Sequence, residues 1–318
     1  MKKRFLAVLA VLGTASMLCG FDSAETADSV FSKMQAASVE AESTDMDMDM
    51  NVDVAVNIGD GSTTSSLAIA MSGDFSVETT MDPLAVGMEG SLDLSTFGQT
   101  QTLTMKMYSV TNEAGELESY VYTEDSSLGE GAWTYDNSGA LGLDLDAAME
   151  QVKNLTAQDY AEWGFEFTLA PEAADVDGTE CYVLSTVLDA DTINTILDKA
   201  AVLTGEDLTE DESVAQALAL LSGLKMNLDY YVDAATYLPV KMHMDMNDSD
   251  FSIISQLVQS LMGSEDSTTT IDVVINDLSV DAAMAYNAVD AVEVPADAIA
   301  AVESGEASSM QEIVDAAL

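Results

Sequence analysis

The chain is poor in the side chains that most enzymes and nucleic-acid-binding proteins use. It has one histidine, two cysteines and nine basic residues against 57 acidic residues, for a formal charge of −48. A surface this negative repels phosphate backbones, so we expect no nucleic-acid partner and no polybasic docking to lipid. His243 and Cys181 offer few combinations of nucleophile and base, and no glycine-rich phosphate loop follows a strand. The sequence therefore predicts no enzyme and no cofactor.

The chain nevertheless has the composition of a folded protein. Apolar residues make up 48% of it, and the mean hydropathy is +0.13. A disordered acidic tail would lack the apolar area that offsets the entropy of an ordered chain. The 318 residues suit one large domain, and two small domains are the alternative.

The N-terminus has the pattern of an export signal. Three basic residues, at positions 2–4, precede an apolar run at 5–18 that is too short to span a bilayer. No later stretch approaches ~20 uninterrupted apolar residues. Removing residues 1–18 removes three of the nine basic residues and no acidic residue, so the charge of −48 becomes −51 and no arginine remains. Such a chain has no bidentate guanidinium group with which to bind carboxylates or phosphates.

Cys19 ends the apolar run and is followed by Gly20, as is the acylated cysteine of bacterial lipoproteins. The preceding Leu18 is bulkier than the small residue that lipoprotein processing favours. We expect an exported protein anchored to the membrane at the cell surface through Cys19. The alternative is ordinary cleavage between positions 20 and 27, which would give a secreted protein. In both cases Cys181 lacks a disulfide partner and is interpreted as a buried strand residue.

The strongest pattern is an alternation of apolar and polar residues over 45–58. Methionine, valine and isoleucine occupy the even positions, and aspartate, asparagine and alanine occupy the odd ones. This period of two predicts a long strand with one apolar face. A short amphipathic helix is expected before it, over 28–41. Closely spaced strands separated by turn residues continue to 135, which predicts an antiparallel meander.

The second half mixes helices and hairpins. Helical spacing predicts helices at about 145–155, 191–203, 211–222 and 250–262, with a further turn behind Thr156. Strands are expected at 165–169, 181–187, 226–232, 238–246 and 269–280, with Asp177-Gly178 in a hairpin turn. We divide the chain into a leader (1–27), one sheet domain with helical insertions (28–295) and a peripheral acidic helical tail (296–318).

This order of elements, together with two late hairpins, resembles the LolA/LppX-like lipoprotein-carrier superfamily. The first hairpin reads Val-Asp-Gly-Thr-Glu-Cys-Tyr-Val-Leu over 176–184, and the second reads Tyr-Tyr-Val-Asp-Ala-Ala-Thr-Tyr-Leu-Pro-Val-Lys-Met over 230–242. In the second, an aromatic strand ends in aspartate, turns, and returns through a Leu-Pro step. One departure is that LolA uses arginine in its cavity region, whereas the chain after the leader has none.

The resemblance implies an α+β fold, with a strongly curved, incompletely closed antiparallel sheet (a half-barrel) and helices packed on its concave face. The helices at 145–155, 191–222 and 250–262 would close an apolar cavity that holds acyl chains. The expected function is a non-catalytic binding or carrier protein for a lipid or other hydrophobic molecule. The alternative is a cell-surface structural or interaction module whose methionine-rich core is filled.

The chain contains 19 methionines, many of them at alternating strand positions. Thioethers are flexible and polarizable, so a face lined with them can fit ligands of varied shape, although the same alternation also suits an ordinary core. The residues predicted to line the cavity are Met46, Met48, Met50, Val52, Val54, Met105, Met107, Met226, Leu228, Met242, Met244 and Met246.

Two metal sites were weighed, and neither is favoured. His243 lies between methionines at 242 and 244, but successive strand residues face opposite ways, so a thioether–imidazole copper site is not expected. Aspartates at 45, 47, 49 and 53 form an acidic row that lacks the glycine turn and bidentate glutamate of a calcium loop. A solvated strand face is the expected role of that row.

Overall fold

The computed structural model describes residues 25–59, 64–112, 117–127, 129, 131–136, 156–195, 223–252, 255 and 270–309. The helices are α2 (Ala27–Val39), α4 (Ala157–Glu162) and α8 (Ala296–Ser304). The strands of the first half are β1 (Ser43–Gly59), β2 (Thr64–Met81), β3 (Leu84–Thr96), β4 (Gln99–Thr111), β5 (Leu117–Asp125) and β6 (Ala132–Asp136). Those of the second half are β7 (Thr168–Leu169), β8 (Ala174–Val176), β9 (Thr179–Leu188), β10 (Met226–Asp233), β11 (Pro239–Asp245), β12 (Thr270–Tyr286) and β13 (Ser308–Ser309).

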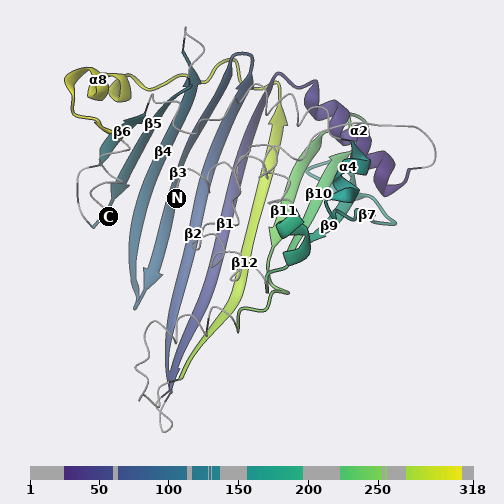
Figure 1. Ribbon diagram of the computed structural model, residues 1–318, viewed down its shortest axis with the longest axis horizontal. Coiled ribbons are helices and arrows are strands. Elements are labelled where there is room, and N and C mark those ends of the chain that lie inside the picture. The colour runs from purple at the N-terminus through teal and green to yellow at the C-terminus, as the bar shows by residue number, and fades with distance from the viewer. Residues whose placement is uncertain are drawn as a thin grey trace.

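All of these strands belong to one 13-stranded sheet, whose long central strands run side by side in Figure 1. The order is β13-β6-β5-β4-β3-β2-β1-β12-β11-β10-β9-β7, and β8 pairs with β9 outside this path. The pairs are antiparallel except β13 with β6. Within the described residues the edge strands β13 and β7 do not pair, so the sheet stays open. The predicted fold class, an antiparallel sheet that does not close into a barrel, is confirmed.

The two halves of the chain meet at the pair β1–β12. β1 and β12 are 17 residues long each, and they pair from Thr44 with Tyr286 to Gly59 with Thr270. The register shifts once, between Asp53 and Val54. The shift sets Asn276 between two paired positions, and its side-chain amide lies 3.4 Å from the Asp53 carboxylate. This bulge keeps the apolar residues of β12 on one face along the whole strand.

Local sequence signals explain the ends of the helices. Thr26 caps α2, because its hydroxyl accepts a hydrogen bond from the Ser29 amide at 3.2 Å. Thr156 caps α4, and the Asp159 carboxylate accepts a hydrogen bond from the Thr156 amide at 2.7 Å, which completes a capping box. The expected helix over 28–41 and the expected turn behind Thr156 are therefore confirmed.

Two core clusters lie at opposite ends of the sheet and on opposite faces. The first packs α2 and α4 against β9 and β10, and its buried members are Val30, Phe31, Met34, Tyr160, Leu184 and Val232. The second packs α8 and the segment before it against β3–β6, and its buried members are Ala85, Tyr108, Tyr120, Trp133, Val292 and Ala298. The register places Leu184 and Val232 on the methionine side of the sheet and Tyr108 on the aspartate side.

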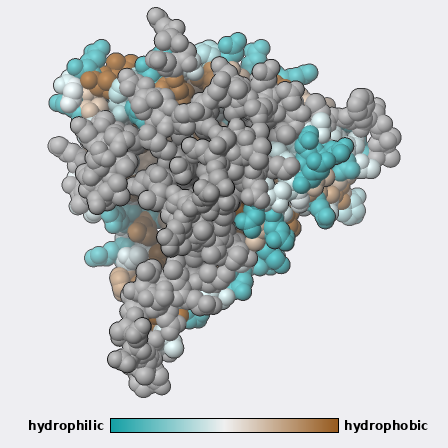
Figure 2. Space-filling view, viewed as in Figure 1, coloured by the Kyte–Doolittle hydropathy of each residue, from teal (hydrophilic) through white to brown (hydrophobic). Residues whose placement is uncertain are grey.

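The tail after Pro295 joins the sheet edge. Ala298 of α8 is fully buried, and the Trp133 indole donates a hydrogen bond to Asp297 at 3.2 Å. In the same view as Figure 1, hydrophobic residues gather near α8, and hydrophilic ones lie over the side where α2 and α4 are found (Figure 2). The helix predicted over 191–203 is helical at 190–195. The rest of that helix, the whole of 145–155 and 211–222, and most of 250–262 lie outside the described residues.

Candidate ligand-binding face

The residues predicted to line a cavity lie on one face of the sheet, which we call the apolar face. The register of the strand pairs shows which residues share this face, because directly paired residues point to the same side of a sheet. Met48 pairs with Phe75 on one side and with Ala282 on the other. The row continues through Gly90 to Met105 in one direction and through Met242 to Tyr230 in the other.

Neighbouring rows repeat this arrangement. Met46 pairs with Val77 and Met284, and Met50 pairs with Gly73 and Val280. Met107 belongs to the row of Met46, because it pairs with Met88, which pairs with Val77. Leu228 and Met244 pair with each other and extend the row of Met50 through Val280. Met246 follows β11 directly, and its amide donates to the Leu278 carbonyl at 3.0 Å.

Sequence reasoning missed part of the apolar face. It did not select the residues that β2, β3 and β12 contribute, although their alternation was visible in the sequence. They are Leu67, Ile69, Met71, Phe75, Val77, Met88, Leu92, Leu94, Val273, Ile275, Leu278, Val280, Ala282 and Met284. The sequence does not show which strands pair. β12 lies more than 200 residues from β1 in the sequence, so the side chains of β12 join this face only through the tertiary structure.

The apolar face carries no charge over its central strands. Among the described residues of β1–β4 and β10–β12, the register places no lysine, aspartate or glutamate on this side. Most of its large side chains are half-buried, unlike the residues of the two core clusters. Leu228 and Ala282 are exceptions, being 7% and 1% exposed. Hydrocarbon is the chemistry that such an uncharged surface accommodates.

The opposite, polar face carries the aspartates, as expected. Asp49 pairs with Asp74 on β2 and with Asp281 on β12, so three carboxylates stand on neighbouring strands. A hydrogen bond with Asp74 raises the pKa of Asp49, and burial and the negative charges of Asp74 and Asp281 act in the same direction. Lys241 pairs with Asp281 at 2.8 Å. This hydrogen bond, followed by one from His243, lowers the pKa of Asp281.

The structure also separates His243 from the methionines. His243 Nδ1 lies 3.2 Å from Asp281 Oδ1 on the polar face, whereas Met242 and Met244 belong to the apolar face. The expectation that histidine and thioethers point apart is confirmed. Within the described part of the chain, no three histidine, cysteine, aspartate or glutamate side chains are placed to hold a metal ion.

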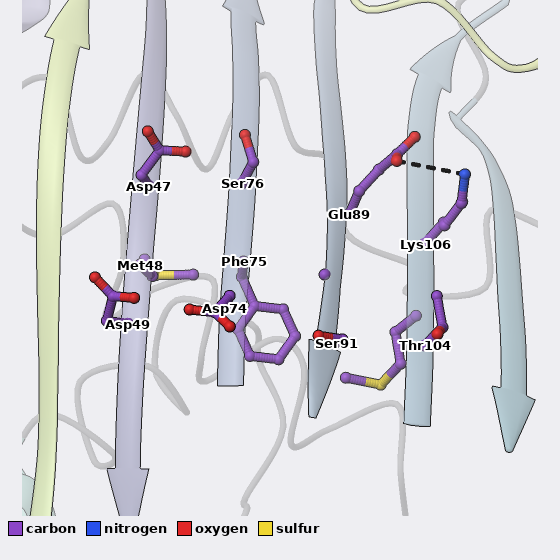
Figure 3. A pocket seen from close by; sticks show the side chains of 12 residues that line it. Asp47, Met48, Asp49, Asp74, Phe75, Ser76, Glu89, Ser91, Thr104 and Lys106 are labelled. Carbon is purple, nitrogen blue, oxygen red and sulfur yellow. Dashed lines mark ion pairs between the residues drawn. The ribbon is translucent and has the colours of Figure 1, made fainter. Parts of the chain in front are cut away.

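A hollow of about 570 Å³ lies over β1–β4 (Figure 3). Met48 and Met105 are the members of the predicted cavity set that line it, and carboxylates of Asp47, Asp49 and Glu89 line it as well. Lys106 pairs with Glu89 at 3.3 Å, as drawn in Figure 3. The carboxylates make this hollow unsuited to a hydrocarbon chain. The candidate site is therefore the apolar face and not this hollow.

The described cysteine is inert. Cys181 is fully buried on β9, and its thiol donates a weak hydrogen bond to the Thr179 carbonyl at 3.5 Å. Burial, more than the nearby carboxylates, raises the pKa of the Cys181 thiol. A nucleophilic cysteine needs the opposite shift. The interpretation of Cys181 as a buried strand residue is confirmed, and Cys19 lies outside the described residues.

Comparison with known proteins gives few matches at the level of sequence. A family of unknown function (DUF6612) matches residues 26–158, which is less than half of the chain. No curated protein matches the chain. Over the described residues, no helix has the length and apolar character needed to cross a bilayer.

Several solved structures are similar at low scores. The lipoprotein LppX of Mycobacterium tuberculosis has 10% identity and a TM-score of 0.33, with 83% of this chain and 94% of LppX covered. LprF of Mycobacterium bovis has 15% identity and a TM-score of 0.31, with 77% and 89% covered. A putative outer membrane lipoprotein-sorting protein domain of Vibrio parahaemolyticus has 9% identity and a TM-score of 0.19, with 77% and 87% covered. LppX, one of the two proteins after which the LolA/LppX-like superfamily is named, is among these structures.

Proposed function

We propose that this protein binds or carries a lipid or another hydrophobic molecule on the apolar face of its open sheet. The observation that supports this most directly is the uncharged row of methionine, valine and leucine side chains that continues across β1–β4 and β10–β12. An antiparallel sheet that exposes one face to water carries polar residues there, so a face without charge over the described residues of seven strands suits contact with hydrocarbon.

Burial is the driving force in this proposal. A bound hydrocarbon chain gains roughly 25 cal/mol for each Å² of apolar area removed from water. Methionines adapt to chains of different shape because their thioethers are flexible. The two core clusters pack helices against the sheet near its two ends, one cluster on each face, and the apolar face runs across the strands between those ends. Met46, Met48 and Met50 belong to neither core cluster, so in this proposal a bound ligand supplies packing contacts for them.

We also propose export and anchoring at the cell surface through an acylated Cys19. The acidic chain repels anionic membranes, so its own surface would not hold it there. A lipoprotein carries two or three acyl chains, which anchor it stably, whereas one chain binds only weakly. Secretion without an anchor is the alternative. Locating the original protein and a Cys19→Ala variant in the membrane fraction or in the medium distinguishes the two.

The test is lipid analysis of gently purified protein. The full chain is extracted in mild detergent, and the co-purifying lipid is quantified by mass spectrometry against the protein. We expect close to one ligand per protein, in addition to any acyl groups attached covalently to Cys19. A Cys19→Ala preparation separates the two contributions. Protein that is empty, and that takes up no fluorescent fatty acyl probe, would instead indicate a structural or interaction module with a filled core.

A further inference from the structure

Gln35 on α2 is a buried polar residue without a hydrogen-bond partner. It is 0% exposed, and neither its amide nitrogen nor its amide oxygen has a partner within the described part of the chain. Burying an amide without replacing its bonds to water costs free energy, so native proteins rarely keep such a group without a reason. A ligand that supplies the partner is such a reason.

Gln35 faces the sheet at the upper end of the apolar face. Residues three and four apart share one side of a helix, so Gln35 lies on the side of Phe31 and Ser38. Phe31 belongs to the core cluster that packs α2 against β9 and β10. Ser38 is also buried, and it lies beside Tyr286 at the end of β12, although its hydroxyl has no hydrogen-bond partner among the described residues. These two neighbours place Gln35 between β10 and β12.

Two other buried polar groups without partners stand on strands of the apolar face. The hydroxyls of Thr44 and Thr186 have no hydrogen-bond partner among the described residues. Thr44 pairs with Tyr286, and Thr186 pairs with Leu228, so both belong to the apolar face. α2 ends just before β1 and packs against β9, and the two threonines stand on these strands. Thr44 lies at the Tyr286 end of the apolar face, away from Thr186. Thr186 lies on β9 one row from Tyr230 of the neighbouring strand β10, on the part of the sheet against which α2 packs.

Two tyrosines complete this polar end. Burial raises the pKa of Tyr230 to about 12, and burial likewise raises the pKa of Tyr286, whose hydroxyl has only the Met284 thioether as a weak acceptor at 3.7 Å. Both phenols are thus neutral donors at physiological pH.

We propose that Gln35, with Thr186 and Tyr230, binds the polar head of a neutral lipid whose hydrocarbon chains lie along the apolar face. This inference rests on the proposed function and adds the ligand class. The amide of Gln35 offers one donor group and one acceptor, which suits a head with an ester or amide carbonyl and a hydroxyl. Because the head is buried beneath α2, pairing it with these groups removes the cost of leaving them unpartnered.

The head is uncharged in this proposal because no described cation reaches this position. Lys33, the lysine of α2, is bound to Glu25 at 2.8 Å and to the Tyr237 hydroxyl at 3.1 Å. The apolar face itself carries no charged side chain on β10–β12. A phosphate or free carboxylate would therefore be buried without a counterion, which is strongly unfavourable.

The test compares three probes: dioleoylglycerol, squalene and dioleoylphosphatidylglycerol. Dioleoylglycerol has the neutral polar head, squalene is hydrocarbon only, and phosphatidylglycerol is anionic. The full chain carrying Cys19→Ala is stripped of lipid and titrated with each probe. We expect Gln35→Met, which keeps the side-chain length, to weaken dioleoylglycerol binding about tenfold or more, which corresponds to about 1.4 kcal/mol. Squalene binding should stay unchanged, and the melting temperature of the empty variant should rise.

The matched control is Gln158→Met, which changes an exposed glutamine on α4. Thr186→Val provides an independent variant if Gln35→Met does not fold. Equal weakening of dioleoylglycerol and squalene would show that Gln35 only supports the fold and would overturn the inference. Tighter binding of the anionic probe would overturn it as well. If the unmodified protein binds squalene without preferring dioleoylglycerol, only this inference fails; if it binds no probe at all, the proposed function fails with it.

Discussion

The ring of Phe75 fills the space beside Gly90, its partner on the neighbouring strand. The two residues are directly paired on the apolar face, and a Cβ built on Gly90 would collide with the Phe75 ring and with the Asp74 carbonyl oxygen. Gly73 is covered by the same ring, because a Cβ there would lie 2.7 Å from Phe75 Cε2. Figure 3 shows the ring extending from β2 toward β3. Pairing an aromatic ring with glycines keeps this part of the sheet closely packed.

This relationship predicts that Gly90→Ala destabilises the protein. Replacing glycine with alanine in a strand normally stabilises, since the unfolded chain loses freedom. Here the added methyl group must displace the Phe75 ring, and overpacking of this kind costs about 1–3 kcal/mol. Urea denaturation measures the loss. Gly87→Ala on the same strand is the control, because its Cβ would lie 3.1 Å from Val292 Cγ1 and should cost less. A Gly90→Ala protein as stable as the original would contradict the packing described.

A second prediction concerns the apolar face and a double variant in which Met48→Gln and Met105→Gln are combined. Two amides on this face remove part of the surface against which a hydrocarbon chain packs, at a cost of about 1 kcal/mol for each. We expect the amount of bound lipid to fall by about tenfold or more, as measured by mass spectrometry of purified protein. Asp47→Asn, on the polar face between these rows, should leave the amount unchanged. Unchanged lipid in the double variant would remove the apolar face as the binding surface.

The row of three carboxylates predicts that Asp49→Asn raises the melting temperature at pH 7. The pKa of Asp49 is raised in the folded protein, first by its hydrogen bond with Asp74, so the folded state binds a proton there more tightly than the unfolded chain does. The unfavourable contribution of Asp49 is therefore present above its folded-state pKa and disappears as the pH falls below its ordinary value. The gain should shrink in 0.5 M salt, where the repulsion is screened to within roughly 5 Å. A gain that persists at acidic pH would point to a different cause.

The pKa of Asp281 is shifted in the opposite direction to the pKa of Asp49. Its pKa is lowered, first by the hydrogen bond from Lys241 and then by that from His243. The stabilisation from this group is present above its unfolded pKa of about 4 and is lost as the pH falls through the lower folded value. Lys241 and Asp281 are 37% and 40% exposed, so screening by solvent limits the effect to less than about 1 kcal/mol.

We therefore expect Asp281→Asn to lower the melting temperature at pH 7 and to match the original protein near pH 2. Asp47→Asn serves as the control for the general loss of one negative charge from a very acidic protein. If both variants change the melting temperature equally at every pH, the pair between Lys241 and Asp281 contributes nothing specific.

The anchor proposal predicts the location of a Cys19→Ala protein. Without the cysteine no acyl chains can be attached, and the acidic surface has no affinity of its own for an anionic membrane. The variant should be found in the culture medium or in the soluble fraction, while the original stays with the membranes, as measured by immunoblotting. Metabolic labelling with a radioactive fatty acid should mark only the original. Membrane retention of the variant would mean that something other than Cys19 holds the protein.

The α2 end of the sheet shows where sequence reasoning stopped. The apolar spacing of Val30, Phe31 and Met34 predicts the helix, but nothing in that spacing singles out Gln35. Burial of Gln35 depends on which strands the helix crosses, and no local pattern encodes that. The same holds for Thr186, which is 3% exposed although it lies on a strand whose local pattern does not single it out.

The sequence by itself determined the apolar and polar faces of β1, because a strand alternates its side chains and Met46–Val56 follow that period strictly. It also determined the positions of the turns, as in the Asp177-Gly178 hairpin. Only the tertiary structure decided that β12 pairs with β1, which joins the two halves into one sheet and sets Asp49 beside Asp281. The physical reason is that alternation fixes the direction of each side chain along a strand, whereas the neighbour that it meets depends on pairing between segments far apart in the chain.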